Sequence, residues 1–229
     1  MSSPKFDTIE SAITAFRAGD FIIVLDSPSR ENEGDLIIAA SALTPPKASF
    51  MIHHSSGYLC APMRASRADA LDLAPMVSAT QNSDPNRTAY TITVDAAQDV
   101  TTGISARDRS VTCVALSDTG VGKEGFRRPG HVVPLRAVEG GVRARQGHTE
   151  AAVEFCRLAW PEKEPVGVIA ELVDESEEVT REGSVKAERT GTEMMKRDGC
   201  LAFGKRYGIK VVTIEDLVKF VEDEESAKR

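Results

Sequence analysis

The sequence contains no apolar run that approaches the roughly 20 residues a transmembrane helix needs. Residues 1–7 are polar and lack the apolar core of a signal peptide. The sequence also lacks closely spaced cysteines: no two of them have the CxxC spacing of a zinc site or a redox dithiol. The cysteines are Cys60, Cys113, Cys156 and Cys200. We therefore expect a soluble, cytoplasmic protein with buried, reduced thiols and no membrane partner.

An excess of basic residues is lacking as well. The 229 residues include 28 Lys and Arg against 35 Asp and Glu, which gives a formal net charge of −7 at pH 7. Because non-specific binding of nucleic acid depends on Lys and Arg that neutralise phosphates, we expect no nucleic-acid partner. A small anionic substrate needs only a few well-placed arginines and stays compatible with this composition.

Strand-like and helix-like patterns alternate along the chain, and no Pro/Gly/Ser-rich linker divides it. Strands are expected at 21–25, 36–40, 58–61, 90–94, 131–138, 166–172 and 210–213. Helices are expected at 9–16, 47–54, 105–116, 149–159, 190–207 and 214–221, capped in three cases by Asp7, Ser105 and Thr213. The Glu-rich stretch 174–188 is expected to be a surface loop, and residues 222–229 a charged tail. Without a strict βαβ repeat, this order predicts one α+β domain over residues 1–229, a mixed β-sheet core surrounded by helices.

Carboxylates crowd the turn between the first two expected strands. Asp26, Glu31, Glu33 and Asp35 lie with Arg30 in a segment longer than the roughly two to five residues of a plain hairpin loop. A bound divalent cation would relieve the repulsion between these carboxylates. A solvated hairpin loop is the alternative interpretation of this segment alone.

A second candidate site is the segment RQGHTE at 145–150, which begins an expected amphipathic helix. Free backbone N–H groups and the positive end of the helix dipole favour an anion there. Arg145 can add a charge-assisted contact and Thr149 a hydroxyl donor, and Gly147 allows the backbone to approach a phosphate. An ordinary helix start is the alternative.

Two single residues are further candidates. His131 follows the residues RPG just before an expected strand, where a lone histidine is more often structural. Glu171 ends an apolar strand, and a buried carboxylate is costly in free energy unless it is paired or bound to a metal. Glu171 is therefore a candidate acid or base with a shifted pKa.

Five segments occur in the order typical of one enzyme family. They are RENEGD (30–35), TTGISARDR (101–109), RPGHVVPL (128–135), GGVRARQGHTEA (140–151) and VTIEDL (212–217). Together they resemble the signature segments of 3,4-dihydroxy-2-butanone 4-phosphate synthase, and the resemblance runs from about residue 8 to 220. It implies a homodimer with active sites near the subunit interface and a requirement for Mg²⁺, with Mn²⁺ as a possible substitute. The implied reaction converts ribulose 5-phosphate into the four-carbon ketose phosphate and formate for riboflavin biosynthesis.

The same resemblance implies a role for each matching residue. Glu31 and His148 would hold the metal, and Glu33 lies on the loop that closes over the substrate. The residues implied to contact the substrate are Arg30, Glu31, Asp35, Arg145, Gln146, Gly147, His148, Thr149 and Glu171. Those implied in turnover are His131 and Glu171, with Glu33 and Asp35 as candidates for proton transfer. Cys60 resembles a cysteine near the site, and a packed thiol is our preferred interpretation of it.

The chain departs from the family at two points and leaves alternative functions open. The stretch 174–188 is longer and more acidic than in bacterial relatives, and the chain ends soon after VTIEDL, so we expect no GTP cyclohydrolase II domain. A metal-dependent isomerase or aldolase of a related pentose phosphate is the alternative enzyme, and formate release separates the two. A nucleic-acid-binding module, suggested by fold analogy alone, conflicts with the acidic charge.

Overall fold

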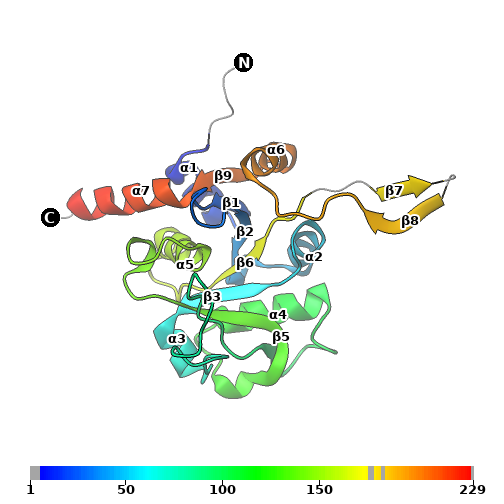
Figure 1. The fold of residues 1–229 in the computed structure, drawn as a ribbon. Coiled ribbons are helices and arrows are strands. Elements are labelled where there is room, and N and C mark those ends of the chain that lie inside the picture. The colour runs from blue at the N-terminus through cyan, green and yellow to red at the C-terminus, as the bar shows by residue number, and fades with distance from the viewer. Residues whose placement is uncertain (1–5, 175–177, 182–183, 228–229) are drawn as a thin grey trace.

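A seven-stranded mixed sheet runs through the centre of the protein, and helices cover both of its faces (Figure 1). The computed structural model describes residues 6–174, 178–181 and 184–227. The strand order in the sheet is β4-β5-β3-β6-β2-β1-β9. In chain order these strands are β1 (Ile22–Leu25), β2 (Gly34–Ala39), β3 (Cys60–Arg64), β4 (Val94–Ala96), β5 (Phe126–Ala137), β6 (Gly167–Glu171) and β9 (Lys210–Thr213).

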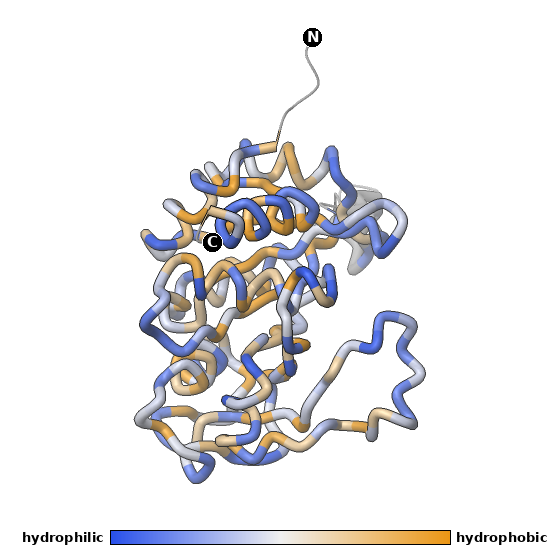
Figure 2. The backbone as a smooth tube through the Cα atoms, turned by 90° about the vertical axis from the view of Figure 1, so that its left-hand side faces the viewer, coloured by the Kyte–Doolittle hydropathy of each residue, from blue (hydrophilic) through white to orange (hydrophobic). Residues whose placement is uncertain are grey.

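The central strands bury side chains on both faces of the sheet. Along β1, Ile23 and Leu25 pack into one core while Ile22 and Val24 pack into the other, because successive strand side chains point to opposite faces. Helices α2, α4 and α6 contribute to the first core, and α1, α5 and α7 to the second. Figure 2 shows apolar stretches gathered in this packed interior and mostly hydrophilic projecting loops. The helices are α1 (Ile9–Arg17), α2 (Pro45–His54), α3 (Ala65–Ala70), α4 (Ala106–Ser117), α5 (His148–Ala159), α6 (Arg197–Tyr207) and α7 (Ile214–Ala227).

The predicted α+β class, with one mixed sheet surrounded by helices, is confirmed. Two predicted caps are also confirmed: Ser105 accepts a hydrogen bond from the Asp108 backbone N–H, and Thr213 accepts one from Asp216, both at 3.0 Å. All four cysteines are unbonded and buried, as expected. Within the described part of the chain, no helix combines the length and apolar character needed to cross a membrane.

The strand predicted at 90–94 is wrong. Tyr90 and Thr91 form only isolated bridges, to Leu135 and Pro75 respectively, and the nearest strand, β4, begins at Val94. The segment bridges two different neighbours instead of running along one of them. Its apolar alternation does not follow burial either, because Thr91 is buried whereas Tyr90 and Ile92 are only half-buried.

The cap predicted for the first helix is also wrong. Thr8 is the N-cap of α1, and its hydroxyl accepts a hydrogen bond from Ser11 N at 3.3 Å. Asp7 instead accepts hydrogen bonds from Lys210 Nζ at 2.7 Å and Val211 N at 3.0 Å. This carboxylate ties the start of α1 to β9, which lies beside β1 in the sheet.

Two regions near the C-terminus differ from the prediction. The helix expected over 190–207 begins only at Arg197, because the preceding residues pair with the segment just after β6: Met195 N donates to Leu172 O at 2.9 Å. The last helix continues to Ala227, so residues 222–227 are helical rather than a tail.

The Glu-rich stretch contains two strands where we expected a loop. β7 (Glu178–Arg181) and β8 (Ser184–Arg189) pair antiparallel in a ribbon that projects from the body (Figure 1). The loop prediction is wrong for these residues. Residues 175–177 and 182–183 of the same stretch lie outside the described part of the chain.

Gly130 allows β5 to pass close to β4. An added Cβ would lie 2.0 Å from Val94 C and 2.2 Å from Asp95 N, where only backbone could move aside. We therefore expect Gly130→Ala to lower the free energy of unfolding by about 3 kcal/mol, measured by urea denaturation. Gly122→Ala is the matched control, because nothing lies within 4 Å of its added Cβ. Equal stabilities of the two variants would contradict the prediction.

Candidate active site

The acidic turn between β1 and β2, the start of α5 and the end of β6 meet at one small cavity of about 80 Å³. This cavity brings together most of the predicted site residues from segments far apart in the sequence. It is lined by Arg30, Glu31, Glu33, Asp35, Cys60, Thr88, Tyr90, Leu135, Arg145, His148, Thr149, Ile169 and Glu171.

Strand pairing explains why two of the carboxylates meet there. β2 runs antiparallel to β6, and Asp35 lies directly opposite Glu171. Residues opposite each other in a sheet share a face, so both side chains belong to the same side of the cavity. Asp35 is buried, and its Oδ1 makes no hydrogen bond within the described part of the chain.

The acidic turn is held in shape by Asp26. Its Oδ2 accepts hydrogen bonds from Arg30 at 3.0 Å and from Glu31 N at 2.9 Å, and its Oδ1 accepts one from Glu33 N at 2.9 Å. The Asp26 side chain is only 1% exposed. The turn is therefore an ordered structure built around a buried carboxylate, and the alternative of a plain solvated hairpin does not describe it.

His148, the first residue of α5, lies next to this acidic turn. Its Nε2 donates a hydrogen bond to Val24 O of β1 at 3.1 Å. Its Nδ1 faces Glu31 Oε2 at 3.7 Å and Asp35 Oδ1 at 3.6 Å. The backbone carbonyl thus fixes the ring so that the second nitrogen points at two carboxylates.

The charges in the cavity perturb one another strongly. Burial alone would lower the pKa of His148, but the carboxylates of Asp35 and Glu31 raise it to about 9. Burial raises the pKa of Asp35 to about 7, although His148 opposes this shift. His148, together with Arg30, lowers the pKa of Glu31 in spite of its partial burial. Burial also raises the pKa of Glu33.

Glu171 is held by a residue that the sequence analysis missed. Ser56 Oγ donates to Glu171 Oε2 at 2.7 Å, and Ser56 N donates to Glu171 O at 2.8 Å. The serine follows α2 and is 115 positions away in sequence. No local signal in the sequence could have connected the two residues.

Arg145 is fixed from three sides. Its guanidinium donates to Glu150 Oε2 at 2.5 Å, to Thr88 Oγ1 at 3.0 Å and to Asn86 O at 3.1 Å. An arginine has five N–H donors, so two remain for a ligand. Gly147 does not line the cavity; an added Cβ there would lie 2.3 Å from Arg145 Nη1, so this glycine makes room for the arginine.

His131 and Gln146 lie outside the cavity within this chain. His131 Nδ1 donates to Asp95 Oδ2 at 2.7 Å, and the His131 backbone N–H donates to Asp95 Oδ1 at 2.8 Å. The His131 side chain is 39% exposed. Gln146 is exposed just before Gly147, the N-cap of α5.

The family model of 3,4-dihydroxy-2-butanone 4-phosphate synthase matches residues 10–220. The chain belongs to this family. The synthase of Pyricularia oryzae is 54% identical over 98% of this chain and 94% of its own length. The synthase of Saccharomyces cerevisiae is 46% identical over 94% of this chain and 99% of its own length. The predicted family, and with it a lyase of riboflavin biosynthesis, is confirmed.

Solved structures of 3,4-dihydroxy-2-butanone 4-phosphate synthase share the fold. A crystal structure in complex with two magnesium ions has a TM-score of 0.88 and 54% identity, and the match covers 96% of this chain and 99% of that one. A cation-free form has a TM-score of 0.86 and 52% identity, with 96% of this chain and all of that one covered.

The cavity residues fit a magnesium ion of the kind bound by that synthase. No three His, Cys, Asp or Glu side chains within the described residues form a group that could hold a metal by themselves. Mg²⁺ typically takes only one or two protein carboxylates and completes its coordination with water and substrate oxygens. Glu31 supplies one such carboxylate and His148 an imidazole nitrogen, and the buried Asp35 Oδ1 without a hydrogen bond lies beside them as a second carboxylate oxygen.

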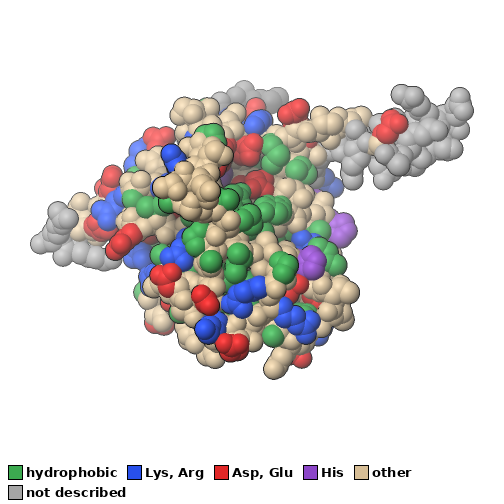
Figure 3. Space-filling model, turned by 60° about the horizontal axis from the view of Figure 1, so that its bottom comes forward, with side chains coloured by type: hydrophobic (Ala, Val, Ile, Leu, Met, Phe, Trp, Pro, Cys, Tyr) green, Lys and Arg blue, Asp and Glu red, His purple; other side chains and the backbone are tan. Residues whose placement is uncertain are grey.

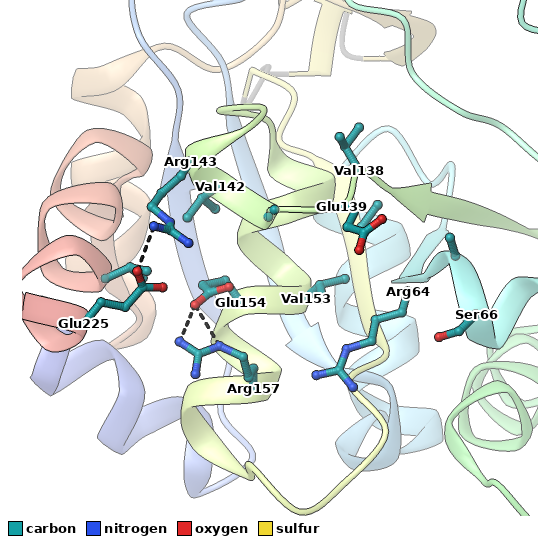
Figure 4. Close-up of a pocket in the computed structure, with 15 residues that line it drawn as sticks. Arg64, Ser66, Val138, Glu139, Val142, Arg143, Val153, Glu154, Arg157 and Glu225 are labelled. Carbon is teal, nitrogen blue, oxygen red and sulfur yellow. Dashed lines mark hydrogen bonds and ion pairs between the residues drawn. The ribbon is translucent and has the colours of Figure 1, made fainter. Parts of the chain in front are cut away.

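A larger cavity of about 490 Å³ lies elsewhere, beside α5 and α7, and contains none of the predicted site residues (Figure 4). Two of its arginines are neutralised there: Arg143 pairs with Glu225 at 2.7 Å and Arg157 with Glu154 at 2.5 Å. This cavity therefore lies apart from the residues that the resemblance to the synthase family implies.

Asp26→Asn tests whether the buried carboxylate organises the synthase cavity. An amide has one acceptor oxygen where the carboxylate has two, so at least one turn hydrogen bond is lost. We expect the free energy of unfolding to fall by about 2 kcal/mol in urea denaturation, with a large loss of turnover. Asp20→Asn, at an exposed position, is the control and should match the unmodified protein. Unchanged stability and turnover in Asp26→Asn would contradict this role.

Proposed function

We propose that the small cavity is the active site at which the chain converts D-ribulose 5-phosphate into L-3,4-dihydroxy-2-butanone 4-phosphate and formate. The observation that carries the proposal is the orientation of His148, whose Nδ1 faces Glu31 Oε2 and Asp35 Oδ1 while Nε2 is bound to Val24 O. A histidine whose second ring nitrogen donates to a backbone carbonyl is typical of a metal ligand.

Glu31 and His148 would hold Mg²⁺ in this cavity. Mn²⁺ is a possible substitute, because carboxylate and water oxygens suit both ions. Bound there, the metal would act as a Lewis acid for oxygens of the sugar. The two magnesium ions in the related synthase structure support the choice of metal.

Asp35 is our candidate for proton transfer at the sugar. Enolisation needs a base that removes a proton next to the carbonyl group, and such a base works best with a pKa near the operating pH. Burial raises the pKa of Asp35 to about 7, and its position opposite Glu171 gives the cavity a second carboxylate for later proton steps. Ser56 orients Glu171 for such a role.

The phosphate group would bind at the N-terminus of α5. The two remaining N–H donors of Arg145 and the hydroxyl of Thr149 lie at that end of the helix, where backbone N–H groups also favour an anion. Arg30 lines the same cavity and can contact the substrate from the acidic turn.

Glu33 would close the open side of the site. Its carboxylate lies 3.9 Å from Lys196 Nζ, at the N-cap of α6, and its side chain is 23% exposed. An ordered turn that excludes water protects reactive intermediates from side reactions. Closure of this turn over the substrate fits the position of Glu33 at the rim.

A homodimer would bring His131 to the cavity of the second copy. Asp95 accepts the Nδ1 proton of His131, which leaves Nε2 of the neutral ring as a base. Ile104, 52% exposed, follows Gly103, which packs against His131 and Asp95. Apolar side chains gather on one face of the molecule, with charged ones around them (Figure 3).

The cavity has an exposed apolar rim of its own. Tyr58 is 47% exposed and packs at a tilt of 48° against Tyr90 of the cavity wall, with ring centroids 6.4 Å apart. An interface that covers Tyr58 of one copy with the Ile104 region of the other would unite His131 with the partner's carboxylates.

The cellular setting and domain content are part of the same proposal. Four unbonded, buried cysteines support a reducing compartment such as the cytoplasm. We propose that residues 1–229 form a single synthase domain.

Formate release from ribulose 5-phosphate tests the proposed reaction. We expect stoichiometric formate with added Mg²⁺ and none with EDTA. Once EDTA removes the metal from Glu31 and His148, the sugar oxygens have no Lewis acid. Glu31→Gln and His148→Ala should each lower turnover at least about 1000-fold while circular dichroism stays unchanged. Pentose phosphate consumed without formate would point to an isomerase or aldolase, and full turnover in either variant would overturn the metal assignment.

Mixing two inactive variants tests the shared site. His131→Ala and Glu31→Gln should each be inactive alone, but unfolding and refolding them together should restore about a quarter of the unmodified activity. Half of the dimers are then mixed, and each has one complete site. A mixture that stays inactive would contradict a His131 that acts in the partner's cavity.

A further inference from the structure

Asn86 lies between the two halves of the proposed active site. Its side-chain Nδ2 donates to Glu31 Oε1 at 2.6 Å, and its backbone carbonyl accepts a hydrogen bond from Arg145 Nε at 3.1 Å. A carboxylate can only accept hydrogen bonds, so the atom of Asn86 nearest to it must be the amide nitrogen. One residue therefore contacts both the proposed metal ligand and the proposed phosphate-binding arginine.

The hydrogen bond to Asn86 determines how Glu31 presents its second oxygen. With Oε1 engaged by Asn86, Oε2 is the atom that faces His148 Nδ1 at 3.7 Å and accepts from Arg30. Without a donor at Oε1, the carboxylate could rotate about its last side-chain torsion, which is broad and weakly restrained. Asn86 thus selects one rotamer of a flexible ligand.

The loop that carries Asn86 is stiffened by its own side chains. Thr88 N donates to Asp84 Oδ2 at 2.7 Å, Asp84 N donates to Asn82 Oδ1 at 2.9 Å, and Asn82 Nδ2 donates to Thr88 O at 3.1 Å. Thr88 also accepts from Arg145 Nη2 at 3.0 Å. These hydrogen bonds hold Asn86 in place before any ligand binds, which lowers the entropy lost when the site binds its ligands.

We propose that Asn86 is a positioning residue that holds the metal ligand Glu31 in its binding orientation and ties it to Arg145. The inference rests on the proposed function, because it takes Glu31 as a ligand of the metal. Asn86 contacts no reacting atom in this arrangement. Outer residues that orient a metal ligand commonly change metal affinity by about 10- to 100-fold when they are lost.

Metal affinity tests this role without reference to turnover. The probe is Mn²⁺, whose free ion gives an electron paramagnetic resonance signal that disappears on binding, with Mg²⁺ as competitor. Asn86→Leu keeps the branched shape and the backbone carbonyl but removes the donor to Glu31. We expect Mn²⁺ to bind about tenfold more weakly to this variant. Gln81→Leu, at an exposed position of the same loop, is the matched control and should bind as the unmodified protein does.

A second readout separates positioning from general damage to the loop. If Asn86 acts through Glu31, saturating Mg²⁺ should restore most of the turnover of Asn86→Leu. Turnover that stays low at saturating metal, or Mn²⁺ affinity within twofold of the unmodified protein, would overturn the proposal. Should Asn86→Leu fail to fold by circular dichroism, Asn86→Ala takes its place in both measurements.

Glu31→Gln, measured in the same titration, separates the failure of this inference from failure of the proposed function. If Glu31→Gln loses Mn²⁺ while Asn86→Leu keeps it, the metal site stands and the role of Asn86 is wrong. If Glu31→Gln binds Mn²⁺ as tightly as the unmodified protein, the metal assignment itself is wrong, and the role of Asn86 falls with it.

Discussion

The hydrogen bond from His148 Nε2 to Val24 O joins the sheet to the site. It holds an imidazole at the first turn of α5 against β1, with Nδ1 directed at Glu31 and Asp35. Burying two carboxylates and a histidine without partners would cost several kcal/mol in free energy. Their mutual attraction offsets part of that cost, and a divalent cation in the same space would offset more. The position of α5 relative to β1 therefore determines whether the site can exist.

That position depends on the two-sided burial of the sheet. Ile22 and Val24 pack against α1, α5 and α7, whereas Ile23 and Leu25 pack against the opposite layer of helices. A one-residue slip of β1 would exchange the two faces and also move the Val24 carbonyl away from His148. Since both faces are apolar, the register has to come from the pairing partners. β2 and β9 supply it on either side, in antiparallel and parallel pairing.

The sequence predicts what local periodicity and capping determine, and it fails where partners are distant. The caps Ser105 and Thr213 act on N–H groups three residues away, so they could be identified directly. Asp7 has the same local signal, but Lys210 and Val211 engage its carboxylate from 203 and 204 positions away. The strand expected at 90–94 failed for the same reason, because Tyr90 and Thr91 bridge two separate distant segments instead of one strand. Long-range pairing overrides local preference in each case.

The site residues also fall into those that the sequence reveals and those that only the fold reveals. Glu31, His148 and Glu171 lie in segments whose composition is unusual for their setting, and so they could be identified before their contacts were known. Ser56 and Asn86 are ordinary polar residues of turns, and only the fold gives them a role, 115 and 55 positions from the carboxylates that they hold. A charged residue in a segment that becomes buried can be recognised from the sequence, because its charge is unusual there. Residues that orient such groups need only a donor at the right point in space, which many sequences could supply. These supporting contacts are nevertheless part of the site's chemistry, because a metal ligand binds well only when its orientation is fixed.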